Sequence, residues 1–167
     1  MRWVIILGLG ILLTNWSSAR AEHASIDLRI TDHEPGTGRI KGQASAHADE
    51  EPPPGGVNAR PVLKVKAKDP LDLQFFYTNT YPHGDVADVT IRYFVTKVDK
   101  VGQKTVPEPM KNAVIRGSFT LNFKPKARVG ARTAFSIAEP GVYLLKVESL
   151  NTKSDHEHFS AIDLVVE

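Results

Sequence analysis

The 167-residue sequence has 21 Lys and Arg residues, 19 Asp and Glu residues, no cysteine and a formal net charge of +2 at pH 7. The absence of cysteine excludes disulfide bonds, a thiol nucleophile and a lipid-modified amino-terminal cysteine. Arg2 and Arg20 lie in the first 21 residues, so the remainder has 21 − 2 = 19 basic residues against 19 acidic ones. Such a balanced charge does not favour a nucleic-acid or an anionic membrane partner.

Residues 1–21 have the pattern of a signal peptide. Arg2 provides a positive start, residues 4–13 form an apolar run, and Ala19, Arg20 and Ala21 form a small-x-small cleavage signal. The run is about ten residues long, whereas a membrane-spanning helix needs roughly 20. An uncleaved anchor is the alternative. We therefore expect export to the bacterial periplasm or cell surface, with no transmembrane segment after cleavage.

The next segment combines one strand with a linker composition. Residues 22–31 contain a run, 25–31, in which large aliphatic residues alternate with polar ones, as in a half-buried strand. Residues 32–60 contain only two large aliphatic residues and a run of prolines and glycines, which predicts a flexible linker. The early strand is then either part of the domain, a free arm, or a strand donated to another subunit.

From residue 61 to residue 167 the sequence predicts one β-domain. Period-2 alternation and intervening turn signals indicate strands at 62–68, 71–78, 86–98, 118–124, 133–137, 143–149 and 159–166. No segment sustains a helical period of apolar residues. The expected fold is all-β: an antiparallel Greek-key β-sandwich of about seven to eight strands, immunoglobulin-like, with little or no helix. A small barrel is the alternative.

The turn before the penultimate strand favours the sandwich. Pro140 and Gly141 form a tight turn, and Tyr143, Leu145 and Val147 share one face of the strand that follows. A tyrosine in this position typically pins the corner that leads into a central strand. Residues 139–147, Glu-Pro-Gly-Val-Tyr-Leu-Leu-Lys-Val, resemble the penultimate strand of bacterial immunoglobulin-like and PKD-type secreted domains.

That resemblance covers roughly residues 61–167, and residues 63–75 resemble the early hairpin of the same domains. It implies an immunoglobulin-like fold, although Leu145 stands where antibody-type domains carry a cysteine. Residues 65–71 and 79–83 also resemble the start of the cupredoxins, in which a copper-binding histidine follows such a hairpin. A blue-copper site requires a cysteine thiolate, so this chain cannot form one.

Three histidines provide the candidate metal ligands. His156 and His158 are two residues apart, so on an extended chain both point to the same side. In an immunoglobulin-type sandwich their loop lies at the same end as the loop that carries His83. One hypothesis is therefore a surface Zn²⁺ or Cu²⁺ site built from His83, His156 and His158. The alternative is that these are solvated loop histidines.

Two aromatic residues interrupt the alternation of their strands. Phe76 and Phe94 point away from the faces that carry Phe75 and Tyr93. They are either an exposed patch for a protein, peptide or glycan partner or are covered by a neighbouring loop.

No motif of a serine hydrolase, a phosphate-binding loop or a cysteine enzyme occurs in the sequence. We therefore expect an exported, non-catalytic binding or accessory domain that needs no cofactor. The alternative is a periplasmic protein that binds Zn or Cu through the three histidines.

Overall fold

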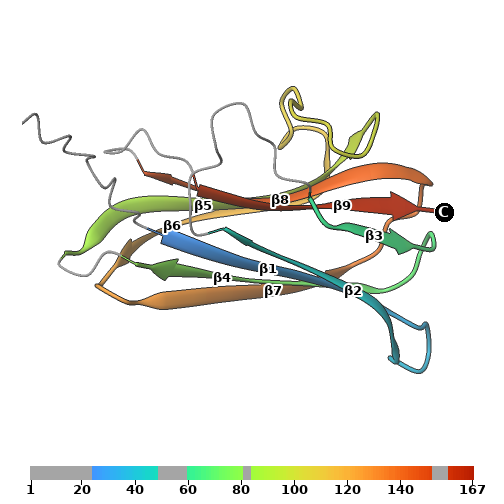
Figure 1. Cartoon of the computed structure of the whole chain (residues 1–167), viewed down its shortest axis with the longest axis horizontal. Helices are drawn as coiled ribbons and strands as arrows, with labels where there is room; N and C mark the ends of the chain where they lie inside the picture. Colours follow the sequence, from blue (N-terminus) through green and yellow to red (C-terminus); the bar gives the residue numbers. More distant parts are fainter. Residues whose placement is uncertain (1–23, 49–59, 81–83, 152–157) are drawn as a thin grey trace, which may run out of the picture.

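The computed structural model describes residues 24–48, 60–80, 84–151 and 158–167, which form two β-sheets packed face to face (Figure 1). This part of the chain contains nine strands and no helix. The strands are β1 (Ala24–His33), β2 (Ile40–Ala48), β3 (Val62–Val65), β4 (Leu71–Asn79), β5 (Val86–Val98), β6 (Ala113–Phe123), β7 (Arg128–Phe135), β8 (Gly141–Asn151) and β9 (His158–Val166). The predicted all-β class is confirmed. Within these ranges there is no helix long and apolar enough to cross a membrane.

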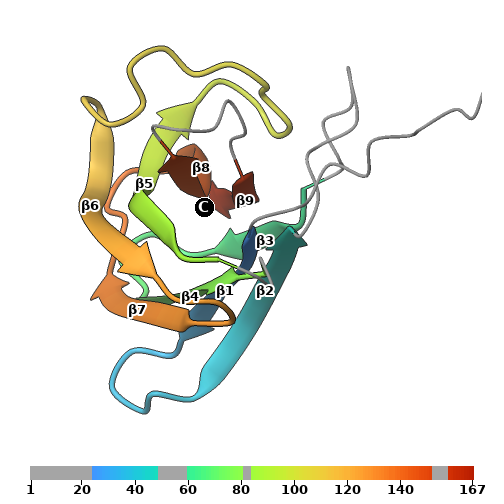
Figure 2. The same cartoon turned by 90° about the vertical axis from the view of Figure 1, so that its left-hand side faces the viewer.

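The strand order is that of an immunoglobulin-like sandwich. One sheet has the order β2-β1-β4-β7 and the other the order β3-β9-β8-β5-β6 (Figure 2). Neighbouring strands are antiparallel except β3 and β9, which run parallel. The β4–β7 pair corresponds to strands B and E of an immunoglobulin domain, and β5, β8 and β9 correspond to C, F and G. The two sheets are separate, so the fold is a sandwich and not a closed barrel.

The amino-terminal part of the fold corrects two expectations. Residues 40–48 form β2, which pairs with β1, so the expected flexible linker is wrong for residues 32–48. The sandwich consequently begins at Ala24 and not at residue 61, and β2 is the strand that the sequence did not predict. Residues 49–59 of the expected linker and the predicted signal peptide, residues 1–21, lie outside the described residues.

The strand β2 escaped prediction because its core-facing side chains are small. Gly42, Ala44 and Ala46 alternate with exposed polar residues, and both alanines pack against the main core. Strand β3 approaches so closely that a Cβ atom added at Gly42 would lie 3.2 Å from Leu63 Cδ1. The alternation of a strand is therefore present, but its inward residues are small. A search for alternating large aliphatic residues does not detect it.

Strand β1 is an integral part of the domain. It pairs with β2 on one side and with β4 on the other. Its apolar residues Ile26, Leu28 and Ile30 are at most 1% exposed. The hypothesis that residues 25–31 are a free arm or are donated to another subunit is therefore wrong.

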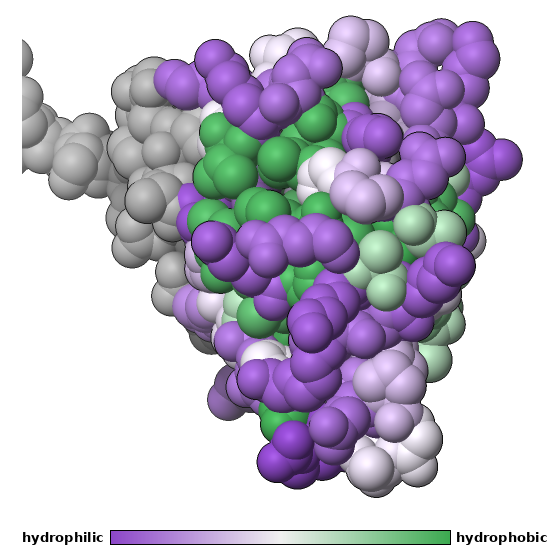
Figure 3. Space-filling model, turned by 90° about the vertical axis from the view of Figure 1, so that its right-hand side faces the viewer, coloured by the Kyte–Doolittle hydropathy of each residue, from purple (hydrophilic) through white to green (hydrophobic). Residues whose placement is uncertain are grey.

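The main core lies between the two sheets and follows the predicted alternation. Alternate residues of β4 and β5 point inward, and Tyr77 of β4 packs against Phe123 of β6 with ring centroids 4.6 Å apart. At the end of the molecule where the carboxyl terminus lies, apolar residues reach the surface between hydrophilic ones (Figure 3). Burial of apolar surface in the main core is the main term that stabilises the fold.

The predicted tyrosine corner is confirmed. Gly141 adopts φ +146°, a value that favours glycine, directly before β8. The Tyr143 side chain is 2% exposed, and its hydroxyl donates a hydrogen bond to the carbonyl oxygen of Glu139 at 2.9 Å. Leu145 and Val147 are fully buried on the same face. This hydrogen bond connects the turn to β8, the strand that follows the turn.

The outer face of the five-stranded sheet is covered by the connection between β5 and β6. Phe94 is 1% exposed and packs with Val98, Leu144 and Ala161 in a second hydrophobic cluster, to which the connection contributes Val106 and Met110. The expectation that Phe94 is an exposed patch residue is therefore wrong. Its outward position is covered by a loop, the alternative that the sequence had left open.

A buried ion pair holds this connection in place. Asp163 on β9 is fully buried and accepts hydrogen bonds from the Gly102 backbone N–H at 2.8 Å and from Arg60 Nε at 3.1 Å. Arg60 also donates to the carbonyl oxygen of Gln103 at 3.0 Å. The carboxylate therefore fastens the connection and the start of β3 to the outer side of β9.

Replacement of the corner tyrosine tests its structural role. Tyr143→Phe should lower the free energy of unfolding by about 1 kcal/mol, because only the hydrogen bond to Glu139 is lost. Tyr143→Ala should lower it by about 3 kcal/mol or more, because the buried ring is lost as well. Urea unfolding monitored by circular dichroism measures both values, and equal unfolding midpoints for all three proteins would refute the assignment.

The two outward aromatic residues should respond differently to truncation. Phe94→Ala should destabilise the fold by about 3–5 kcal/mol, because it empties a buried site. Phe76→Ala should cost no more than about half of that, because Phe76 is only half-buried. Thermal unfolding of the two variants side by side makes the comparison. A larger loss for Phe76→Ala would contradict the assigned burial.

Candidate ligand-binding face

The outer face of the four-stranded sheet carries a group of polar side chains that could recognise a ligand. Residues directly opposite one another form rows across the four strands. The first row is His47, Asp27, Phe76 and Gly130, and the second row is Ser45, Arg29, Gln74 and Arg132. Because side chains alternate along a strand, each row points away from the core. Strand register therefore decides which side chains meet on this face.

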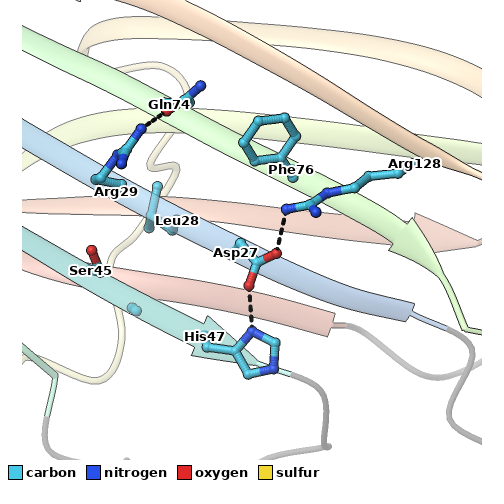
Figure 4. Close-up of a pocket in the computed structure, with 9 residues that line it drawn as sticks. Asp27, Leu28, Arg29, Ser45, His47, Gln74, Phe76 and Arg128 are labelled. Carbon is cyan, nitrogen blue, oxygen red and sulfur yellow. Dashed lines mark hydrogen bonds and ion pairs between the residues drawn. The ribbon is translucent and has the colours of Figure 1, made fainter.

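A hollow of about 350 Å³ lies on this face (Figure 4). Side chains from all four strands surround it, namely Asp27 and Arg29 of β1, Ser45 and His47 of β2, Gln74 and Phe76 of β4, and Arg128 of β7. Its volume lies at the lower end of the range of roughly 300–1,000 Å³ that is usual for small-molecule sites. The hollow combines an aromatic ring, two guanidinium groups and one carboxylate. We refer to it below as the sheet-face hollow.

The floor of the hollow depends on a glycine. Phe76 lies over Gly130, where a Cβ atom would approach the Phe76 ring to 2.6 Å. No other residue at position 130 leaves room for the ring in this orientation. The guanidinium of Arg128 lies over the same ring, with its central carbon 4.2 Å from the ring centroid. This geometry is a cation–π contact, which fixes the plane of the Arg128 side chain.

Asp27 lies at the centre of the polar contacts in the hollow. Its Oδ2 atom accepts a hydrogen bond from Arg128 Nη2 at 2.9 Å, and its Oδ1 atom is 2.6 Å from His47 Nδ1 (Figure 4). One carboxylate on β1 therefore links β2 and β7. All three side chains are about half-exposed, so these pairs contribute little stability, typically 0–1 kcal/mol each. Their main effect is to orient the side chains.

Arg29 occupies the adjacent row of the hollow. Its Nη2 atom donates a hydrogen bond to the side-chain oxygen of Gln74, and Ser45 lies opposite it on β2. Arg29 and Arg128 thus each use one Nη2 group within the protein. A guanidinium has five N–H donors, so most donors of both groups remain for a ligand.

Of the three predicted metal ligands, His158 is the one that lies among the described residues. His158 is the first residue of β9, opposite Ser149 of β8, and is 6% exposed. It shares the inward face of β9 with Ile162, so its expected place in a surface loop is wrong. His83 and His156 lie outside the described residues. Among the residues that the structure describes, no group of three or more His, Asp or Glu side chains could hold a metal ion. The metal site built from His83, His156 and His158 stays a prediction.

Of the predicted patch, Phe76 lies in the hollow and Phe94 lies in the second cluster. Sequence reasoning missed Asp27, Arg29, His47 and Arg128. The first two are the polar positions of a recognised strand, and His47 lay in the expected linker. Alternation in β2 of small residues with Gln43, Ser45 and His47 is the signal that could have revealed His47.

A separate ionic cluster joins the β1–β2 hairpin to the turn before β4. Lys41 Nζ contacts the carboxylate of Asp69 and lies 3.4 Å from Asp32 Oδ2. Both aspartates are at least nine-tenths buried. Burial raises the pKa of Asp32 above its ordinary value of 3.8; Lys41 opposes this rise and the Asp69 carboxylate adds to it. The contact with Asp69 is also the main cause that raises the pKa of Lys41.

No family model and no curated protein matches this chain. Solved structures that match include a family 123 glycoside hydrolase from Clostridium perfringens, with 13% sequence identity and a TM-score of 0.40 over 64% of this chain. The chain spans 23% of that enzyme. A Niemann-Pick type C2 protein from the Japanese carpenter ant has 11% identity and a TM-score of 0.35 over 62% of this chain and 79% of its own. At these TM-scores the similarities carry no argument about function.

The raised pKa of Asp32 predicts a specific pH dependence. The folded state binds this proton more tightly than the unfolded state, so the contribution of Asp32 to stability falls as the pH rises from about 4 through its folded pKa. Asp32→Asn removes that dependence. The stability of the variant relative to the natural protein should therefore increase over this range and level off above it. Urea unfolding at a series of pH values measures the difference, and two parallel profiles would contradict the prediction.

Proposed function

We propose that this protein is an exported, non-catalytic binding domain that holds an acidic, hydroxyl-rich ligand in the sheet-face hollow. The ligand class that fits best is an acidic sugar unit of a polysaccharide, recognised through its carboxylate and its hydroxyl groups. The observation that carries the proposal is Arg128, which stacks on Phe76 and is held by Asp27, next to a second guanidinium, Arg29.

The charge of the hollow favours an anion. Two guanidinium groups face one carboxylate there, so the net charge is positive even when His47 is neutral. Stacking and the hydrogen bond to Asp27 hold Arg128 in one orientation, which reduces the entropy that a ligand must otherwise remove. A planar guanidinium is well matched to a carboxylate, which it binds through two parallel hydrogen bonds.

The neutral side chains favour a ligand with hydroxyl groups. Ser45 and Gln74 line the hollow beside Arg29, and each can both donate and accept hydrogen bonds. The hollow lies on the face of a sheet and not along an edge, so a peptide cannot extend the sheet there. A compact ring with several hydroxyls and one carboxylate meets both sets of groups.

The same contacts support a binding role over a catalytic one. Hydrolysis of a glycosidic bond normally uses two carboxyl groups that flank the bond. Asp27 is the one carboxylate among the described residues that line the hollow, and it is engaged by Arg128 and His47. The nearby Asp72 accepts a bifurcated hydrogen bond from the N–H of Arg132 Nε, which lies 2.8 Å from Oδ1 and 2.9 Å from Oδ2. Export is inferred from the signal-peptide pattern of residues 1–21 alone.

Titration calorimetry with an oligomer of uronic acids, and with a neutral oligosaccharide of the same length, tests the proposal. The acidic oligomer should bind and the neutral one should bind at least about tenfold more weakly, because it lacks the carboxylate. Arg128→Gln should weaken binding of the acidic oligomer by about tenfold or more. Added salt should weaken it further, since the contact is ionic.

Arg132→Gln is the matched control. Arg132 lies on the same strand and the same face as Arg128, but it pairs with Asp72 and does not line the hollow. Its replacement should leave the affinity unchanged. Equal binding of the acidic and neutral oligomers, or an equal loss in both variants, would overturn the proposal.

A further inference from the structure

Strand β6 forms an outer edge that is poorly protected against pairing with another strand. In the described part of the chain the sheets end at β2, β7, β3 and β6. Strand β3 has four residues and follows Pro61, and β7 carries Arg128 and Arg132. Strand β6 has eleven residues, no proline and one charged residue, Arg116. Short length, charge and proline are the usual means by which edge strands avoid pairing. Strand β2, with nine residues, shares with β6 a single Lys or Arg and the lack of proline, and β6 is the longest of the four edge strands.

The side chains of β6 are also incompletely covered. Val114 is 47% exposed and Leu121 is 38% exposed. Ile115 and Phe119 face the core but stay only half-buried, because no strand of the described residues lies beyond β6 (Figure 2). A strand added at this edge would cover them.

We propose that β6 is a self-association edge, at which a second copy of this chain pairs its own β6 antiparallel about a two-fold axis through Ser118. Ser118 is the central residue of the strand, so this register alone pairs all eleven residues. The two five-stranded sheets would then form one continuous ten-stranded sheet. Such a contact is isologous, since the same residues of both copies take part.

The sequence of β6 is complementary to itself in this register. On the outer face Arg116 lies opposite Thr120 and Val114 lies opposite Asn122, so no like charges meet. On the core face Ile115 lies opposite Leu121, which pairs two incompletely covered apolar side chains. Cross-strand apolar pairs of this kind stabilise a sheet, whereas like charges directly opposite one another destabilise it. A register centred on Arg116 would place that residue opposite itself.

Gly117 also favours this pairing of the two β6 strands. The ring of Tyr93 on β5 lies over Gly117, since a Cβ atom there would be 2.4 Å from that ring. In the proposed register Phe119 of the second copy lies opposite Gly117. The Phe119 ring of the second copy would therefore contact the Tyr93 ring. Aromatic pairs of this kind stabilise a contact beyond the contribution of the buried apolar area.

The pairing leaves the four-stranded sheet uncovered, because β6 belongs to the other sheet. A dimer would thus present two sheet-face hollows. This consequence rests on the proposed function, whereas the pairing itself does not. Two linked sites would bind a polymeric ligand more tightly than either site alone.

Sedimentation of the full chain at concentrations from micromolar to millimolar tests the pairing. The natural protein should reach about twice the mass of one chain as the concentration rises. Ser118→Lys places two like charges at the axis and should keep the protein at the mass of one chain, and Ser118→Glu should do the same. An equimolar mixture of the two variants should recover the dimer, because Lys then faces Glu.

Ala134→Lys is the control, since Ala134 is exposed on another edge strand, β7. It should dimerise like the natural protein, and circular dichroism should show that every variant is folded. A natural protein that stays at the mass of one chain throughout would overturn the proposal. So would a Ser118→Lys variant that dimerises as the natural protein does, or a mixture that fails to recover the dimer.

Discussion

The structure depends on the position of β1 between β2 and β4. Its apolar side chains are completely buried in the core, and its polar side chains are the middle of the outer face. Asp27 on that face contacts His47 of β2 and Arg128 of β7, so a single carboxylate orients groups from two other strands. A shift of one residue in the pairing of β1 would turn both sets of side chains over. The hydrophobic core therefore fixes the geometry of the hollow.

The two outer faces of the sandwich illustrate two outcomes for an aromatic residue that points away from the core. On the five-stranded sheet Phe94 is covered by a connection that a buried carboxylate, Asp163, fastens to β9. On the four-stranded sheet Phe76 lies over Gly130 and beneath Arg128, and remains half-exposed. Sequence alternation identified both residues equally well. Only the path of the covering connection separates a structural role from a candidate binding role.

Two differences between the sequence prediction and the structure have different physical causes. The sequence of β2 predicts a linker because its inward positions hold glycine and alanine, which bury little apolar area. At Gly42 the neighbouring strand β3 limits the space, since an added Cβ atom would lie 3.2 Å from Leu63 Cδ1. His158 was assigned to a loop because β9 was expected to begin one residue later. That single residue moves a histidine from the surface to the interior of the sandwich.

The sequence by itself determined the fold class, most of the strands and the tyrosine corner, because period-2 alternation and a Pro-Gly turn are local features of the chain. It also pointed to Phe76 as a residue that is not part of the core. Tertiary structure decided which residues meet on the outer face and which edge stays open. Asp27, His47 and Arg128 are up to 101 residues apart in the sequence and meet only through strand register. Register is set by packing across the whole sandwich, so no local pattern encodes it.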